Sequence, residues 1–348
     1  MKFKHLETLD MSLARNWSLI FVALCPISSI AHHNNLGQYN QDNVGEISGI
    51  VTNLLWANPH IFVDVETATG TVWEIELQGP RQLTQLGLSQ SDVEVGAQVT
   101  FAGALSVQNA TGMSASHLLK PNCEEVLLTY RIEPRWNDCE IVETQAQSGQ
   151  GDSSNPEAGI FRVWVLGPSG FHPINGRDPD SFPMNDAALA AYREFDALSA
   201  PTTDGCTTKG MPTILDNPLP YEFVERENSI ELLFEEYDAV RVIHMDAGLP
   251  LAEAEPSPMG YSVGSWDGET LEVTTTAIDW PWLNQFGFPQ SAESLIVERF
   301  TAIEDGARLQ HVMTITDPVY LTEPLVMEHY RISNPNIALQ SYNCQTKE

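Results

Sequence analysis

Histidines near the start of the chain form the first group of side chains that can do chemistry. His32 and His33 follow Ala31 directly, and His60 follows Pro59. If Ala31 is the last residue removed on export, His32 carries a free α-amine beside its imidazole. These nitrogens suit Cu²⁺, which tops the affinity order of the divalent metals. The pattern predicts a copper site at His32, His33 and His60. The alternative is a solvated N-terminal segment, with a packing or turn role for His60.

A second group of reactive side chains lies in the last third of the chain. Arg241 and Glu298 fall in strand-like segments, from which they can point into the interior of a β-barrel. A carboxylate, a guanidinium and an imidazole that meet there can carry out acid–base chemistry. The catalytic candidates are Arg241, Glu298, Asp317 and His244. The wider polar set of this region also includes Tyr237, Asp238, Arg299, Glu328 and His329. The alternative is a set of ion pairs, either on the outer face or buried with a purely structural role.

Large aromatic side chains are concentrated in residues 279–288. Four of them in so short a segment would be costly to leave in water. They can line the mouth of a barrel and bind an apolar or carbohydrate ligand, or they can form a satellite core under the loop. The candidate ligand-binding residues are Trp266, Trp280, Trp282, Phe286 and Phe288.

An apolar segment at residues 18–31 indicates export. It is too short to span a bilayer, follows the positive charge of Arg15, and ends in the small-x-small pattern of Ser29 and Ala31. We therefore predict a signal peptide over residues 1–31, translated from Met1 or Met11, and a mature N-terminal segment over 32–43. The alternatives are an uncleaved N-terminal anchor or a lipoprotein modified at Cys25.

Charge and cysteine content narrow the class of protein. The chain has 17 Lys and Arg against 47 Asp and Glu, a net charge of −30. Such a charge opposes binding to nucleic acid and to anionic lipid, so we expect no nucleic-acid partner. The aromatic segment favours a small-molecule partner, and cleavage of the short apolar segment leaves no stable membrane insertion. An even number of cysteines remains after cleavage, which suits two disulfides in an extracytoplasmic compartment, either the periplasm or the medium. Three pairings are open, and we favour Cys123–Cys139 and Cys206–Cys344.

The first domain is predicted over residues 44–120. Its strand-like segments are residues 46–55, 61–66, 71–77, 98–105 and 113–119, with a short helix at 80–86. Five strands with a helix between the third and fourth is the order of an OB-type small barrel. A connector that bears the first disulfide follows over residues 121–158, and it includes a polar linker at 145–157.

The second domain is predicted over residues 159–348. It opens with a strand at 160–166 and contains one good helix at 186–198, which Asn185 or Asp186 can cap. Eight further strand-like segments recur at hairpin spacing, which predicts an antiparallel β-barrel or a strongly curved sheet. These segments are residues 221–226, 229–235, 240–245, 262–266, 270–276, 295–303, 308–315 and 325–333. The fold class is therefore mainly β, with an OB-like barrel followed by a larger antiparallel domain.

Several short motifs resemble those of uncharacterised exported bacterial proteins. These proteins carry an "AHH…NPH" pattern in a small N-terminal β domain that precedes a β-rich domain. The matching segments here are residues 31–33, 58–60, 260–271, 297–300 and 316–318. The resemblance implies export and this architecture, and it brings no established activity.

Three hypotheses for the function follow. The first is an exported protein that binds a small, partly apolar or carbohydrate ligand in the C-terminal β domain. The second is a copper carrier or oxidative enzyme that uses His32 and His60. The third is an acid–base lyase, isomerase or hydrolase in the C-terminal domain.

Overall fold

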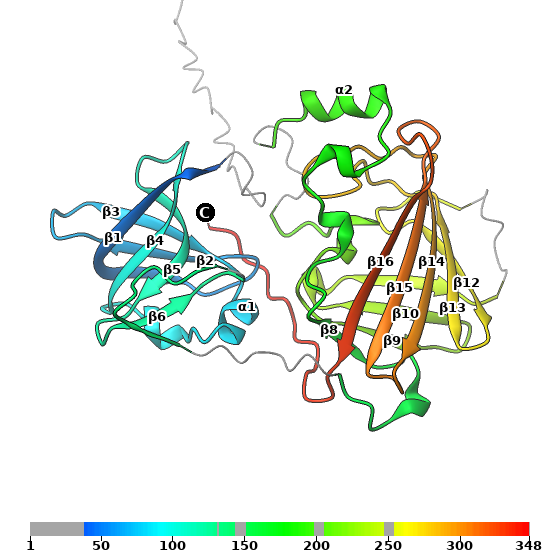
Figure 1. The fold of residues 1–348 in the computed structure, drawn as a ribbon, viewed down its shortest axis with the longest axis horizontal. Helices are drawn as coiled ribbons and strands as arrows, with labels where there is room; N and C mark the ends of the chain where they lie inside the picture. Colours follow the sequence, from blue (N-terminus) through cyan, green and yellow to red (C-terminus); the bar gives the residue numbers. More distant parts are fainter. Residues whose placement is uncertain (1–37, 131, 143–150, 198–204, 247–253, 348) are drawn as a thin grey trace, which may run out of the picture. The chain divides into compact units, whose positions relative to one another are not determined.

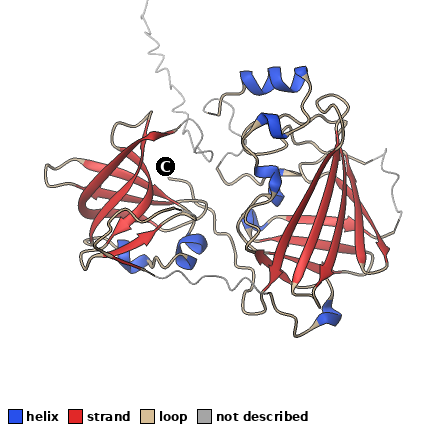
Figure 2. Ribbon diagram, in the orientation of Figure 1, coloured by secondary structure: helices blue, strands red, loops and turns tan. Residues whose placement is uncertain are grey.

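A computed structural model describes residues 38–130, 132–142, 151–197, 205–246 and 254–347. These residues form a mainly β protein, as predicted, with an N-terminal sheet and a closed C-terminal barrel (Figures 1 and 2). None of the helices in these ranges is long and apolar enough to cross a membrane.

The N-terminal sheet is barrel-like. Its elements are β1 (Tyr39–Leu55), β2 (Ile61–Glu66), β3 (Val72–Leu77), α1 (Pro80–Gln85), η1 (Gln90–Val93), β4 (Gln98–Ser106), β5 (Gly112–Leu119), β6 (Glu124–Leu127) and β7 (Glu140–Ile141). The sheet runs β3-β2-β1-β4-β5-β6-β7, and a parallel pairing of β3 with β5 joins its first five strands into a ring. This is the OB-like connectivity that the sequence predicted, with α1 between β3 and β4.

Alternating burial explains why these segments form strands around one core. In β2, Ile61, Val63 and Val65 are fully buried, and the residues between them are more exposed. Phe101 on β4 and Leu118 on β5 pack into the same apolar cluster. A period of two in burial is what a sheet with one face on a core requires.

The structured region begins earlier than predicted. β1 starts at Tyr39, before the predicted domain start at residue 44, and its first residues pair with the end of β4. This part of β1 is mostly exposed and polar, so no hydrophobic alternation marked it as a strand. Here it is the pairing with β4, and not the residue pattern of β1 itself, that makes the segment a strand.

Part of the predicted connector also belongs to the sheet. β6 pairs antiparallel with β5, and β7 pairs parallel with β6. The predicted disulfide between Cys123 and Cys139 is present and joins the two ends of this extension. The described part of the predicted linker, residues 151–157, is likewise fixed to the barrel: the Asp152 amide donates to Ser333, and Arg162 donates to the Asp152 and Asn155 carbonyls.

The C-terminal barrel consists of nine strands. They are β8 (Val163–Leu166), β9 (Tyr221–Glu225), β10 (Ser229–Phe234), β11 (Val240–His244), β12 (Tyr261–Asp267), β13 (Thr270–Thr276), β14 (Leu295–Ile303), β15 (Arg308–Thr316) and β16 (Leu325–Ser333). The ring runs in the order β10 to β16, then β8, then β9. Closure leaves no open edge of the kind that invites aggregation.

One pairing in this ring differs from the purely antiparallel prediction. β11 and β12 run parallel, through Ile243 with Ser262 and His244 with Val263. Two parallel neighbours cannot be joined by a tight hairpin, which fits the separation of β11 from β12 by residues 245–260. The hairpin pattern therefore predicted both strands correctly, but it predicted an antiparallel arrangement for this pair, and the pair is parallel.

Helices and loops cover part of the barrel. They include α2 (Asp186–Glu194) and the short 3₁₀ turns η2 (Pro156–Ala158), η3 (Pro173–Asn175), η4 (Pro179–Ser181), η5 (Thr213–Leu215) and η6 (Glu236–Asp238). In Figure 1, α2 lies beyond one end of the barrel strands, and its Ala188 is buried in the apolar cluster of the barrel domain. The Asn185 side chain caps α2 by accepting from the Ala188 amide, as predicted.

α2 ends at Glu194, earlier than the predicted 198. Phe195 adopts an extended conformation and packs edge-on against Trp282, with the ring centroids 5.1 Å apart. It also lies so close to Gly287 that a Cβ there would stand 2.2 Å from the Phe195 ring. Tertiary packing of Phe195 therefore ends the helix before the apolar pattern does. The second predicted disulfide, Cys206–Cys344, is also present.

Candidate functional site

The interior of the barrel contains a buried ion pair between Arg241 on β11 and Glu298 on β14. Both side chains are at most 1% exposed, and Arg241 Nη2 donates to Glu298 Oε2. The strands between them contribute hydroxyls: Arg241 Nε donates to Ser262 Oγ at 3.0 Å, and Nη2 donates to Thr275 Oγ1 at 2.7 Å. Four consecutive strands thus meet at one guanidinium, as one sequence hypothesis required of Arg241 and Glu298.

His311 on β15 extends this centre. Its Nε2 lies 3.1 Å from Glu298 Oε1, and its ring stacks on Phe300 at 4.3 Å with an interplanar angle of 7°. Burial raises the pKa of Glu298, but Arg241 and His311 outweigh burial and hold this pKa at about 2. Glu298 is therefore a carboxylate at neutral pH, and His311 Nε2 must donate to it.

Two more histidines face His311. The rings of His172, from the loop before η3, and His311 have centroids 5.3 Å apart, and those of His172 and His329 are 5.1 Å apart. Burial, helped by the nearby charge of Arg331, lowers the pKa of His329 to about 3 and that of His172 well below 6.5. Both rings are therefore neutral at neutral pH.

The hydrogen bonds of the two neutral histidines identify their tautomers. His172 Nδ1 accepts from the Ile174 amide at 3.1 Å, so its proton is on Nε2. His329 Nε2 lies 2.8 Å from the Gly170 carbonyl, which can only accept, so His329 also carries its proton on Nε2.

Arg331 on β16 connects the histidines to a second buried cluster. Its Nη1 donates to the Leu219 carbonyl at 2.8 Å and its Nη2 to the Asn217 carbonyl at 2.6 Å. Its guanidinium lies 4.4 Å from the centroid of the Tyr221 ring. Burial raises the pKa of Tyr221 to about 12, and the positive charge of Arg331 opposes this rise without cancelling it.

The second cluster is built around Lys209 and Glu236. Lys209 Nζ lies 2.7 Å from Glu236 Oε1, and both residues are buried. Burial raises the pKa of nearby Asp216 to about 7. Gln285 Nε2 donates to Asp216 Oδ2 at 3.4 Å. Buried titratable groups with such shifted pKa values occur preferentially at functional sites.

Five buried polar atoms of these clusters have no hydrogen-bond partner in the part of the chain that the structure describes. Two are donors, Arg241 Nη1 and His172 Nε2. Three are acceptors, Asp216 Oδ1, Asn217 Oδ1 and Glu236 Oε2. Buried polar groups in folded proteins almost always have partners, either protein or ordered water. These atoms therefore mark positions where water or a ligand completes the hydrogen bonding.

The other catalytic candidates lie elsewhere. Asp317 is 1% exposed, and its carboxylate accepts from the Ser291 amide and hydroxyl and from the amides of Val319 and Tyr320. It holds together two loop segments. His244 is half-buried and stacks on Tyr261 with the ring centroids 4.8 Å apart. No contact in the described residues joins either side chain to the Arg241–Glu298 pair.

The aromatic loop is largely part of the core. Phe288 is fully buried and Phe286 is 5% exposed, and both belong to the apolar cluster of the barrel domain. Trp280 and Trp282 are half-buried, and Trp280 Nε1 donates to Thr213 Oγ1 at 2.8 Å. Trp266 is 45% exposed, on β12, at an edge contact with Phe161. The satellite core that the sequence left open as an alternative describes Phe286 and Phe288.

The N-terminal copper hypothesis touches the described residues only at His60. His60 Nδ1 lies 2.7 Å from Glu76 Oε1, and Tyr39 donates to Glu76 Oε2 at 2.6 Å. His32 and His33 lie outside the described residues. Within the described ranges, no group of three or more His, Cys, Asp or Glu side chains is arranged to hold a metal ion.

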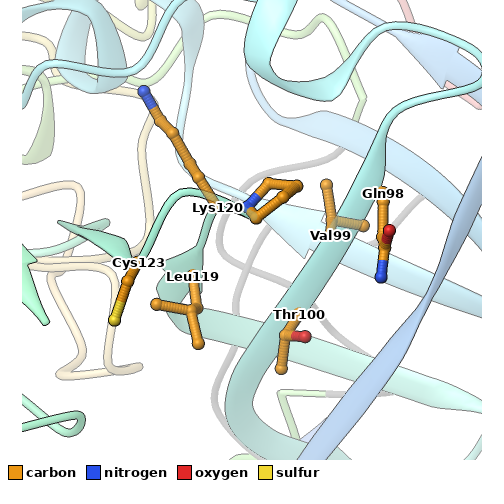
Figure 3. A pocket seen from close by; sticks show the side chains of 7 residues that line it. Gln98, Val99, Thr100, Leu119, Lys120 and Cys123 are labelled. Atoms are coloured by element: carbon orange, nitrogen blue, oxygen red, sulfur yellow. The ribbon is translucent and has the colours of Figure 1, made fainter. Parts of the chain in front are cut away.

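A surface depression of about 240 Å³ lies on the N-terminal sheet, beside the disulfide of Cys123 (Figure 3). Gln98, Val99 and Thr100 of β4 form one wall, and the segment after β5 forms the other. Lys120 of that segment is paired with Asp92 at 2.7 Å. The depression contains none of the buried titratable groups described above.

Sequence reasoning missed His172, His311 and Arg331. His311 lies between Leu309 and Met313 at the inward spacing of β15, and Arg331 occupies the same kind of position on β16. That alternation was a usable signal. His172 lies in an irregular loop, where no periodic pattern could have placed it inside the barrel.

The model of a family of unknown function (DUF6152) matches residues 21–114. This range covers the strands from β1 to β4 and the start of β5, and it stops before the barrel. No curated protein matches the chain.

Proposed function

We propose that this protein is an exported binding protein whose C-terminal barrel holds a small, partly apolar ligand. The ligand would meet the buried centre of Arg241, Glu298 and His311. The observation that carries the proposal is the buried, unpartnered Nη1 of Arg241, whose strand β11 belongs to the closed barrel. The other unpartnered polar atoms of the two clusters support it. Barrels of eight or more strands can enclose a small ligand, and pockets combine apolar walls with a few polar groups.

The surroundings of the centre suit a partly apolar ligand. Met313 lies directly across from Glu298, and Met327 lies beside Met313 on the next strand. Both are buried, and methionine side chains adapt readily to an irregular occupant. The half-buried Trp280 and Trp282 stay candidates for the rim of such a site.

Export is part of the proposal. Two disulfides are expected in an oxidising compartment, and the strong negative charge suits a protein with no nucleic-acid partner. N-terminal sequencing of protein exported from a bacterial host is expected to begin at His32. Retention of Met1 or Met11 would contradict the cleavage.

Ligand-induced stabilisation tests the binding function. A panel of small amphiphilic and carbohydrate compounds is added to the exported protein, and the shift in Tm is measured. A ligand that binds only the native state raises Tm, and the rise grows with the logarithm of the ligand concentration relative to Kd. Glu298→Gln keeps the size of the side chain and removes its charge, so it is expected to reduce the shift. Glu272→Gln, on the neighbouring β13, is the control. The proposal fails if no compound stabilises the protein, or if both variants respond like the wild type.

A second candidate function is copper binding at His32 and His60. It is favoured by the carboxylate of Glu76 at His60 Nδ1, because metal-binding histidines are commonly oriented by such a partner. Protein that starts at His32 is expected to bind one Cu²⁺ in calorimetry, and His60→Ala is expected to weaken binding. One extra N-terminal alanine is expected to abolish it. Unchanged binding by the extended protein would contradict the N-terminal chelate.

A further inference from the structure

His172 presents a buried hydrogen-bond donor to the centre of the barrel. Its Nδ1 is occupied by the Ile174 amide, so the neutral ring carries its proton on Nε2. This Nε2–H is buried and has no partner among the described residues. His172 is 3% exposed, so bulk water does not compensate for the missing bond.

Arg241 presents a second donor of the same kind. Its Nε and Nη2 are used by Ser262, Thr275 and Glu298, and its Nη1 is buried without a partner in the described chain. Glu298 connects Arg241 to His311, whose ring is next to His172. The two donors therefore belong to one connected polar centre, which runs from Arg241 through Glu298 and His311 to His172.

The charges of the buried network favour an anion. Its cations are Arg241, Arg331 and Lys209, and its firmly paired carboxylates are Glu298 and Glu236. The remaining carboxyl group, Asp216, is only partly ionised at neutral pH, because burial raises its pKa to about 7. An excess of positive charge in a buried site is unfavourable unless an anion compensates for it.

We infer that the ligand carries a carboxylate group and that His172 Nε2 and Arg241 Nη1 donate to it. This inference rests on the proposed binding function and specifies its ligand class: an aliphatic or aromatic carboxylic acid with its apolar part among the barrel's Met and Phe side chains. Charge-assisted hydrogen bonds of this type are stronger than bonds between neutral groups.

Matched probes test the head group. Decanoate, decanol and decylammonium share one apolar chain and differ only at the head group. Their binding to the exported full-length protein is measured by calorimetry at pH 7. We expect decanoate to bind about tenfold or more tightly than decanol, in line with two charge-assisted hydrogen bonds. Decylammonium is expected to bind most weakly.

A matched variant tests the donor. In His172→Asn, the Asn side-chain oxygen can still accept from the amide of Ile174, two residues further along the chain. The variant lacks the imidazole Nε2 donor. The variant is expected to weaken decanoate binding several-fold, to keep the part of the preference that Arg241 Nη1 supplies, and to leave decanol binding unchanged. Arg299→Gln, on the exposed face of β14, is the control and is expected to change neither.

The possible results separate the two levels of the proposal. Equal affinity for decanoate and decanol, or a preference for decylammonium, overturns the carboxylate inference and leaves the binding function standing. An unchanged preference for decanoate in His172→Asn overturns the role of His172. Failure of all three probes, in a protein that another compound of the panel does stabilise, overturns the carboxylate class alone. Failure of every compound overturns both levels.

Discussion

Arg241 and Glu298 form an ion pair inside a closed barrel, with both side chains at most 1% exposed. Removing one partner leaves the other as an unpaired buried charge, so Glu298→Leu is expected to cost about 3–5 kcal/mol of the free energy of unfolding. The double variant Arg241→Met and Glu298→Leu is expected to recover most of that loss. Urea denaturation measures both. A single variant within about 1 kcal/mol of the wild type would contradict a buried, paired centre.

The buried histidines predict destabilisation by acid. His329 stays neutral in the folded protein down to a pH of about 3, whereas a free histidine protonates near 6.5. Unfolding therefore takes up a proton between these pH values, and the stability present above pH 6.5 is lost as the pH falls toward 3. Each such histidine contributes up to about 1.4 kcal/mol per pH unit.

A comparison with His329→Gln isolates this effect. The glutamine amide can still donate to the Gly170 carbonyl and does not titrate. Asp216 acts in the opposite direction, because its pKa is raised to about 7 and its contribution to stability is lost as the pH rises from 3.8 toward 7. Asp216 is present in both proteins, so its contribution cancels when the free energy of unfolding of the variant is subtracted from that of the wild type. The free energy of unfolding is measured by urea denaturation at several pH values from 7 to 4. We expect it to fall less steeply with decreasing pH in the variant than in the wild type. An identical pH dependence of the two proteins would contradict a neutral buried His329.

The two disulfides close loops of very different length. Cys206 and Cys344 are 138 residues apart, and Cys123 and Cys139 are 16 apart. In the chain-entropy model, a cross-link over the longer loop stabilises by about 5 kcal/mol and one over the shorter loop by about 3 kcal/mol. Paired Cys→Ser variants, compared by thermal unfolding, are expected to follow this order. A larger loss from the short loop would show that native-state contacts outweigh chain entropy.

The aromatic loop is expected to tolerate changes unevenly. Phe288 is fully buried and packs edge-on against Phe182 at 4.6 Å and Tyr192 at 4.8 Å. Phe288→Ala is therefore expected to cost about 3–5 kcal/mol. Trp282→Ala is expected to cost less, because Trp282 is only half-buried. Equal losses in chemical denaturation would mean that Trp282 is as much a part of the core as Phe288.

The sequence by itself determined most of the strands, and among three open disulfide pairings it favoured the one that the structure shows. Alternation of apolar and polar residues has a period of two in any half-buried strand, so β13, β14 and β16 were predicted with the bounds that the structure shows. The order of elements in the first 120 residues likewise predicted OB-like connectivity. These features depend on local pattern, which a chain carries without reference to its partners.

Tertiary structure alone decided which side chains meet. The alternation of inward and outward positions places Glu298 and His311 inside the barrel. Their contact depends on the register between β14 and β15 and on the order in which the strands close the ring. The same holds for the parallel pairing of β11 with β12. His172 shows the limit most clearly: it lies in a loop, and only the packing of that loop over β15 and β16 brings its ring within 5.3 Å of His311. Local pattern sets which face a residue takes, whereas long-range pairing sets its neighbours, and chemistry depends on the neighbours.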